Sequence, residues 1–347
     1  MDMEYRVLGR SGLRVSQLSL GTLPFGGHQR EIVGNTDLKE ARRILDRAID
    51  SGVNLIDTAD VYGYGRAEST VGELIKGRRD SLIVSTKVRA VIGQGPNDAG
   101  LSRYHIMQGI EASLTRLGVD HIDLYQVHGW DGQTDVDQIM STLDDLVRSG
   151  KVRYIGCSNL SAWHTMKALA AADAAHGERF VSQQIYYSIL GREAEHELIP
   201  LSVDQGIGNL IWSPLAGGLL SGKLKRGRDE QRMRDWWDPP VSDPAPLLDV
   251  IEEVEAVAEE HGASVAQVAI AYLLTKPVTS IILGPRTFEH IDSALGSLSV
   301  HLTPEQIARL DDVSRRPLPY PYWHQARSMT DRLSAADETL LRGGPAL

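Results

Sequence analysis

The sequence predicts an α/β fold, a single-domain (β/α)8 TIM barrel with long loops on the face where the strands end. Eight short apolar runs rich in β-branched residues each precede a polar or glycine-bearing loop and then a segment with helical spacing. The length of 347 residues suits one barrel of about 250 residues with insertions. An open dinucleotide-binding sheet is disfavoured, because Gly21–Gly27, which follows the first run, lacks the G-x-G-x-x-G pattern.

The predicted strands are short and bounded by turn residues. They are Leu18–Gly21, Asn54–Asp57, Ser81–Lys87, Ile122–His128, Val152–Ser158, Phe180–Gln184, Gly208–Ser213 and Thr279–Gly284. The first helix follows Asn35-Thr36-Asp37, and its apolar residues from Leu38 to Ile49 share one face before Ser51-Gly52 ends it. Similar apolar stripes predict helices within Ile106–Leu117, Ile139–Val147, Met166–Ala175 and Val265–Leu274.

Three segments interrupt this alternation. Val88–Arg103 and Gly222–Pro246 are longer than ordinary connections and follow predicted strands, so we expect both over the carboxyl-end face, where active sites of barrels lie. The third segment is the tail that begins at Arg316, in which three prolines are interleaved with aromatic residues. Pro317–Trp323 is therefore not expected to be helical. We therefore predict a barrel domain over 1–316 and a C-terminal tail over 317–347 that lines the substrate pocket. Solvent-exposed loops and a frayed terminus are the alternative.

Composition excludes several classes of function. Asp and Glu number 46 against 36 Lys and Arg, and the net charge of −10 opposes binding to nucleic acid or to an anionic membrane surface. The single cysteine, Cys157, forms neither an internal disulfide nor a metal cluster, which suits a reducing compartment. Met1–Arg6 lacks a targeting pattern, and no run approaches 18 apolar residues. The expected location is cytoplasmic, with no metal site.

Polar residues at the predicted strand ends suggest carbonyl chemistry. Asp57, Lys87 and His128 end three successive predicted strands, and Tyr62 lies five positions after Asp57, so barrel closure would bring them to one rim. A tyrosine hydroxyl, with a pKa of about 10, is a weak acid unless a cation such as Lys87 favours its phenolate. Asp57 would compensate Lys87, and His128 would hydrogen-bond the substrate oxygen. Taken singly, each residue also fits an ordinary structural role, such as a helix cap or a surface charge.

At these residues the chain resembles a known family. Asn54–Gly63 is similar to the signature of the aldo-keto reductase family, and Ser113–Tyr125, Val152–Asn159 and Trp212–Lys223 match further family segments in the same order. The resemblance extends from about Tyr5 to about Leu310. It implies an eight-stranded barrel that binds NADPH in extended form, without a dinucleotide-binding fold. It also implies reversible hydride transfer between that cofactor and a carbonyl compound.

The resemblance assigns roles to individual residues. Asp57, Tyr62, Lys87 and His128 match the catalytic tetrad, and Asp57 also counts among the cofactor contacts. The other cofactor positions are Gly21 and Thr22 beneath the nicotinamide, Ser158, Asn159 and Gln184 at its amide, Trp212 on its ring, Ser213, Leu215 and Gly217 at the pyrophosphate, Arg286 and Thr287 at the 2′-phosphate, and His290 near the adenine. Ala294 stands where the family often has an amide, so NADPH is expected and NADH is the alternative.

The expected function is reduction of an aldehyde or ketone by NADPH, with Tyr62 as the general acid. Phe25, Trp130 and Trp323 are expected to line the substrate pocket, and Trp236 and Trp237 stand in the second long loop. These aromatic residues favour a bulky cyclic or terpenoid ketone. The alternatives are a reductase of sugar-like or small aromatic aldehydes, and a noncatalytic regulatory barrel that binds the nucleotide, as ion-channel subunits of the family do. The sequence does not decide between a monomer and a homo-oligomer.

Overall fold

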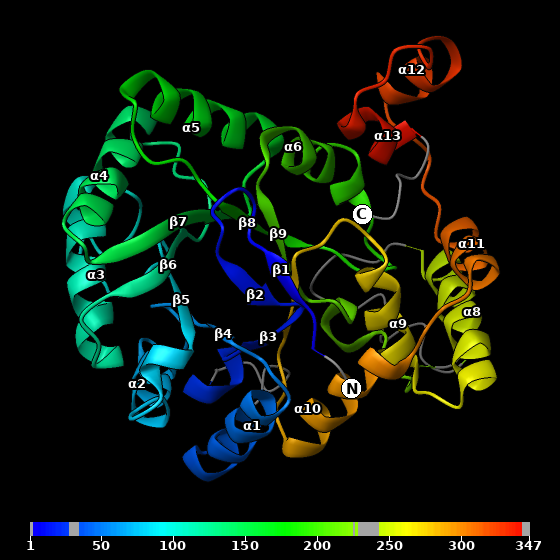
Figure 1. Cartoon of the computed structure of the whole chain (residues 1–347), viewed down its shortest axis with the longest axis horizontal. Helices are drawn as coiled ribbons and strands as arrows, with labels where there is room; N and C mark the ends of the chain where they lie inside the picture. Colours follow the sequence, from blue (N-terminus) through cyan, green and yellow to red (C-terminus); the bar gives the residue numbers. More distant parts are fainter. Residues whose placement is uncertain (1–2, 28–34, 225, 228–242, 342–347) are drawn as a thin grey trace.

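The computed structural model describes residues 3–27, 35–224, 226–227 and 243–341. Eight parallel strands close into a barrel in the order β10-β3-β4-β5-β6-β7-β8-β9, and helices surround it (Figure 1). This arrangement confirms the predicted (β/α)8 barrel.

All eight predicted strands are present. Their bounds are Leu18–Gly21 (β3), Leu55–Asp57 (β4), Ile83–Val88 (β5), Ile122–Val127 (β6), Val152–Ser158 (β7), Ser182–Tyr186 (β8), Gly208–Trp212 (β9) and Ser280–Leu283 (β10). The largest difference from the prediction is at β8, which starts later than Phe180 and continues past Gln184. It continues because Ile185 and Tyr186 pair with Ile211 and Trp212 of β9, a partner that lies outside the local sequence.

The helices between the strands bury one face on the barrel wall. They are Leu38–Asp50 (α1), Arg66–Leu74 (α2), Arg103–Leu117 (α3), Val136–Arg148 (α4), Ala162–Ala175 (α5), Leu198–Gln205 (α6), Ala245–His261 (α8), Val265–Leu274 (α9), Phe288–Leu295 (α10) and Pro304–Val313 (α11). The predicted start of α1 is confirmed, since the Asp37 carboxylate accepts a hydrogen bond from the Glu40 N–H. Buried Ala41, Ile44 and Leu45 belong to the main hydrophobic core.

A hairpin that the sequence did not predict closes the amino end of the barrel. It consists of Tyr5–Val7 (β1) and Arg14–Ser16 (β2). Leu8 and Val15 bury their side chains against strand residues such as Leu55. At Gly9, with φ of +58°, an added Cβ would lie 2.5 Å from the Val181 carbonyl oxygen, so only glycine allows this approach. The hairpin thus covers the amino end of the barrel interior.

The two long loops differ in what the structure describes. Residues 89–102 contain neither helix nor strand, as predicted. Residues 225 and 228–242 of the second loop, with Trp236 and Trp237, lie outside the described residues.

The C-terminal tail forms two short helices, Tyr322–Ser328 (α12) and Ala335–Leu341 (α13), beside α6 (Figure 1). The Tyr322 hydroxyl donates to Glu197 Oε1 at 2.7 Å, just before α6. The expected nonhelical stretch is wrong at Tyr322 and Trp323, because Pro321 only precedes α12 and its missing N–H breaks no helical bond there.

Candidate active site

The barrel brings the four predicted catalytic residues to one rim. Asp57 ends β4, Lys87 is the last but one residue of β5, and His128 directly follows β6. Asp57 pairs in register with Ser85, and Lys87 with Gln126, so the strand ends lie side by side. Tyr62 reaches the same rim from the loop after β4, and its ring meets that of His128 edge-on at a centroid distance of 5.8 Å.

Lys87 and Asp57 form a buried ion pair. Lys87 Nζ lies 2.6 Å from Asp57 Oδ2 and 2.8 Å from the Thr58 carbonyl oxygen, and both charged side chains are almost wholly buried. Burial by itself would lower the pKa of Lys87, but the charges of Asp57 and Tyr62 outweigh it, and the net pKa is raised. The ammonium is therefore charged and held in place.

Two polar residues that sequence reasoning missed support Asp57. Its Oδ1 accepts hydrogen bonds from Ser85 Oγ at 3.1 Å, Gln184 Nε2 at 3.0 Å and Gln126 Nε2 at 3.4 Å. Ser85 and Gln126 were not identified, yet each stands two positions before a tetrad residue. Side chains two apart on a strand share a face, and this spacing is the signal that could have found them.

Tyr62 is suited to donate a proton. Lys87 Nζ lies 3.5 Å from its hydroxyl oxygen. Burial raises the pKa of Tyr62 above its ordinary value of 10.0, and the opposing charge of Lys87 does not cancel this effect. Lys87 favours the phenolate, as expected, but burial has the larger effect on the pKa of Tyr62. The hydroxyl keeps its proton at neutral pH, as a general acid requires.

His128 is held neutral. Burial, together with the charges of Lys87 and Arg89, lowers the pKa of His128 to about 3. Its Nδ1 is buried and has no hydrogen-bond partner among the described residues. A neutral imidazole carries one N–H, which can be offered to a substrate oxygen beside the Tyr62 hydroxyl.

The predicted nicotinamide residues follow His128 around the rim as a connected group. Trp212 Nε1 donates to Asn159 Oδ1 at 3.0 Å, and Asn159 Nδ2 donates to the His128 carbonyl oxygen at 3.1 Å. The Ser158 hydroxyl donates to the Gln184 carbonyl oxygen at 3.1 Å. Asn159 thus links β9 to the segment after β6, in addition to any contact with a cofactor.

Gly21 and Thr22 lie beside Asp57. The Thr22 hydroxyl donates to the Asp57 carbonyl oxygen at 3.0 Å. A Cβ at Gly21 would lie 2.7 Å from Ile282 Cγ2, so the close packing of β3 on β10 needs glycine here.

The predicted pyrophosphate loop has an uncommon backbone. Ser213 and Ala216 have φ of +54° and +48°, and Gly217 has +63°. The Gly217 N–H donates to Ser213 Oγ at 2.8 Å. Left-handed residues other than glycine concentrate at functional sites, where the surrounding fold maintains them against their strain.

The predicted adenosine end gathers positive charge. Thr287 caps α10 by accepting from the His290 N–H, and Arg286 precedes it on the surface. Burial lowers the pKa of His290, and the charges of Arg286 and Lys223 lower it further, so both cations lie near this ring. The sequence analysis named Lys223 only as the last residue of the segment Trp212–Lys223 and gave it no role. A positive charge directly after the predicted pyrophosphate loop was the signal that could have identified it as a phosphate contact.

The predicted substrate residues make their described ring contacts with other residues. Phe25 is 4% exposed and belongs to the main core, and the Trp130 ring stacks on His164 at 3.9 Å. Trp323 meets Tyr320 within its own tail. Their substrate contacts stay predictions.

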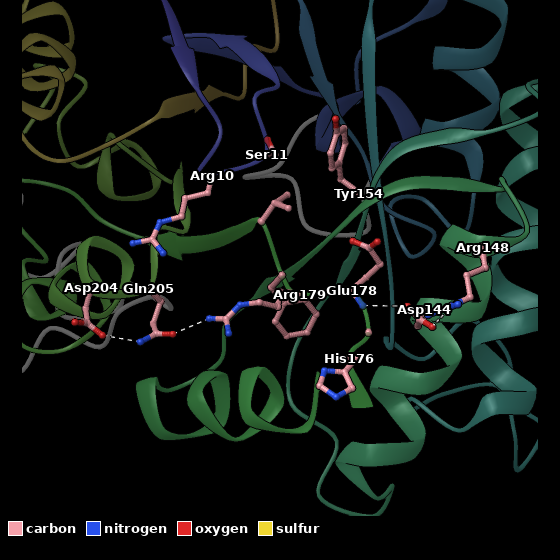
Figure 2. Close-up of a pocket in the computed structure, with 14 residues that line it drawn as sticks. Arg10, Ser11, Asp144, Arg148, Tyr154, His176, Glu178, Arg179, Asp204 and Gln205 are labelled. Atoms are coloured by element: carbon pink, nitrogen blue, oxygen red, sulfur yellow. Dashed lines mark hydrogen bonds and ion pairs between the residues drawn. The ribbon is translucent and has the colours of Figure 1, made fainter. Parts of the chain in front are cut away.

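A cavity of about 880 Å³ lies on the opposite, amino-end face (Figure 2). Its lining includes Arg10 of the hairpin turn, Arg148 at the end of α4, and Arg179 before β8. Arg179 Nη2 donates to Gln205 Oε1 at 2.7 Å. None of the predicted site residues lines it, and the active sites of barrel enzymes lie on the carboxyl-end face. The rim with Tyr62 is the candidate active site.

The structure defines a closed (β/α)8 barrel whose predicted site residues lie at the carboxyl-end rim. The family model described as "Aldo/keto reductase family" matches residues 17–315. The chain belongs to the aldo/keto reductase family.

Named relatives extend over nearly the whole chain. "Uncharacterized oxidoreductase YrpG" of Bacillus subtilis is 40% identical over 331 residues, which cover 91% of this chain and 97% of the relative. "Versiconal hemiacetal acetate reductase" of Aspergillus parasiticus is 35% identical, with 89% and 96% covered. "Probable voltage-gated potassium channel subunit beta" of Oryza sativa is 36% identical, with 90% and 96% covered.

Within the ranges that the structure describes, no helix has the length and apolar character needed to cross a bilayer. The same residues contain no group of three His, Cys, Asp or Glu side chains placed to hold a metal ion.

Proposed function

We propose that this protein reduces an aldehyde or ketone with NADPH and that Tyr62 is the general acid. The observation that carries the proposal is the position of the protonated Tyr62 hydroxyl, 3.5 Å from the Lys87 ammonium and on the same rim as the neutral His128. A carbonyl oxygen placed there would meet donors on both sides.

His128 and Tyr62 have different roles at the substrate oxygen. Negative charge develops on this oxygen during reduction, and His128 stabilises it with its N–H while Tyr62 transfers its proton. The Lys87 ammonium stabilises the resulting phenolate until Tyr62 regains a proton from solvent. Asp57, fixed by Ser85 and Gln184, holds Lys87 in this position.

The rim fits a nicotinamide nucleotide. Ser158, Asn159 and Gln184 offer amide and hydroxyl groups beside Trp212, and the left-handed loop from Ser213 follows directly. When bound, this group supplies the hydride that reduces the carbonyl carbon. The support for NADPH over NADH is the positive charge of Arg286 and Lys223 near His290. The backbone N–H of Phe288, at the start of α10, already donates to Glu40 Oε1 at 2.6 Å. A 2′-phosphate would therefore be bound by the side chains of Arg286 and Lys223 rather than by this N–H.

The substrate class divides between bulky cyclic or terpenoid ketones and aromatic aldehydes. The bulky-ketone expectation rested on aromatic residues in long loops, and the ring contacts of Trp130 and Trp323 are with His164 and Tyr320 rather than with Tyr62 or His128. We therefore propose small aromatic aldehydes as the first compounds for a panel assay of NADPH oxidation, with cyclic ketones and sugar aldehydes beside them.

Replacement of Tyr62 by phenylalanine tests the proposal. Tyr62→Phe removes the proton donor and keeps the ring, so kcat should fall at least about 100-fold while the Kd for NADPH changes by less than about twofold. Tyr64→Phe is the matched control, because Tyr64 lies on the same loop with 64% of its surface exposed. Near-normal turnover by Tyr62→Phe would show that another group is the acid.

A noncatalytic nucleotide-binding role is the second candidate, favoured by the relative named as a potassium channel subunit. The assembled tetrad favours the enzyme. NADPH binding without turnover of any carbonyl in the panel would favour the regulatory role.

A further inference from the structure

Arg89 is a cation at the active-site rim that the reductase mechanism does not use. It lies two residues after Lys87 and one residue beyond β5. Its φ of +132° falls in a region that side-chain-bearing residues rarely adopt and that costs backbone strain. Two hydrogen bonds hold it there. Its carbonyl oxygen accepts from the Gly100 N–H at 2.9 Å, and its Nε donates to the Trp130 carbonyl oxygen at 3.1 Å.

The guanidinium lies beside His128. The Arg89 side chain crosses the segment that follows β6, since a Cβ built on Gly129 would lie 4.0 Å from Arg89 Cδ. Its charge contributes to lowering the pKa of His128, as the charge of Lys87 does. Arg89 is therefore close to the position that His128 offers to the reacting oxygen.

Arg89 forms no ion pair within the described part of the chain. Its Nη groups make no hydrogen bond there, and no carboxylate oxygen lies within 4.0 Å of it. The charge of Arg89 contributes to lowering the pKa of Asp131. The carboxylate oxygens of Asp131 instead accept hydrogen bonds from Leu101 N, Gln133 N and Thr134 Oγ1 at 2.7 to 2.9 Å.

The charges of the four predicted catalytic residues cancel. Lys87 is paired with Asp57, His128 is neutral and Tyr62 keeps its proton. Arg89 adds a positive charge beside this neutral group. A planar guanidinium with free N–H groups binds a carboxylate through two parallel hydrogen bonds, and one positive charge balances one carboxylate better than a phosphate dianion.

We propose that Arg89 is a specificity-determining residue that binds the carboxylate of an oxo acid whose carbonyl group is reduced at Tyr62. The inference rests on the proposed function and narrows its substrate class to aldehydes or ketones that carry a carboxylate. The left-handed backbone and the Trp130 hydrogen bond fix the guanidinium at a set distance from His128, so the separation of carboxylate and carbonyl in the substrate is also selected.

The test compares 4-carboxybenzaldehyde with its methyl ester, which differs in charge and little in shape. Wild-type kcat/KM should be at least about tenfold higher for the acid, and Arg89→Met should lower it about 10- to 100-fold for the acid and less than about twofold for the ester. The 2- and 3-carboxy isomers report the preferred separation. Arg89→Lys should keep part of the preference, because it keeps the charge without the planar fork.

The variants control for one another. Arg89→Met and Arg89→Lys both lose the Nε hydrogen bond to Trp130, and both keep a side chain at a residue with φ of +132°. The difference in kcat/KM between the two variants therefore reports the effect of the charge. Arg103→Met is the control for net charge, because Arg103 pairs with Asp145 at 2.6 Å on the outer surface. An equal loss for acid and ester in Arg89→Met would make Arg89 a support for His128 and overturn the inference.

A binding measurement separates this inference from the proposed function. Calorimetry with benzoate and benzamide on the NADPH-bound protein needs no turnover, and benzoate should bind more tightly to wild type and Arg89→Lys than to Arg89→Met. Reduction of the ester without preference for the acid refutes the role of Arg89 and leaves the reductase in place. If no carbonyl compound is reduced, the proposed function fails, and equal benzoate binding by wild type and Arg89→Met then also removes the carboxylate site.

Discussion

Asp60 is a buried carboxyl group that should destabilise the folded protein above neutral pH. It lies three residues after Asp57 with 1% of its surface exposed, and neither of its carboxyl oxygens has a hydrogen-bond partner of good geometry among the described residues. Burial, and secondarily the charge of Glu68, raises the pKa of Asp60 from 3.8 to about 7. The Val61 N–H and the charge of Arg116 offset this only in part. Replacement of Asp60 by asparagine removes the titrating group and keeps the shape.

The sign and size of the effect follow from proton binding. Between pH 3.8 and about 7 the folded state holds the Asp60 proton that the unfolded state releases, so stability is lost as pH rises through this window. One pKa unit corresponds to about 1.4 kcal/mol, and the penalty therefore grows by about 2–3 kcal/mol between about pH 5 and about pH 8. The stability of Asp60→Asn relative to wild type should rise by this amount over the same range.

Urea unfolding of both proteins at several pH values measures this difference. The control is Asp131→Asn, which should destabilise the protein, because hydrogen bonds to the Asp131 carboxylate lower its pKa although partial burial opposes them. A difference between Asp60→Asn and wild type that does not change with pH would refute the reasoning, since it would mean that the folded protein compensates an ionised Asp60.

Two further predictions concern the cofactor and the tail. Arg286→Ala should weaken NADPH binding by about 1.5–3 kcal/mol and NADH binding much less in fluorescence titrations, because only NADPH carries the 2′-phosphate; equal losses would remove Arg286 from the phosphate. Truncation after Arg316 should leave the barrel folded and NADPH affinity nearly intact in circular dichroism and titration. The truncation should raise KM for bulky ketones more than for small aldehydes. It removes the hydrogen bond from the Tyr322 hydroxyl to Glu197, which lies in the segment after β8. Loss of soluble protein would instead make the tail part of the core.

The pattern of the sequence was sufficient to predict the barrel and the placement of Asp57, Tyr62, Lys87 and His128 at one rim. Strands and helices follow from local periodicity, and Asp57, Lys87 and His128 are recognisable because each stands at the end of an apolar run. The hairpin escaped prediction, because Tyr5–Val7 and Arg14–Ser16 have three residues each and gain stability only where Leu8 and Val15 meet the barrel.

Only the tertiary structure decided how these residues behave. Gln184 and Asp57 are 127 positions apart, yet their hydrogen bond of 3.0 Å fixes the carboxylate that holds Lys87. The pKa of Tyr62 rises because burial outweighs the opposing effect of Lys87, and burial exists only in the folded barrel. Arg89 became visible as a candidate only through its φ of +132° and its position beside His128. Local patterns determine which segments form strands and helices, whereas hydrogen bonds, burial and pKa depend on distances that exist only once the barrel has closed.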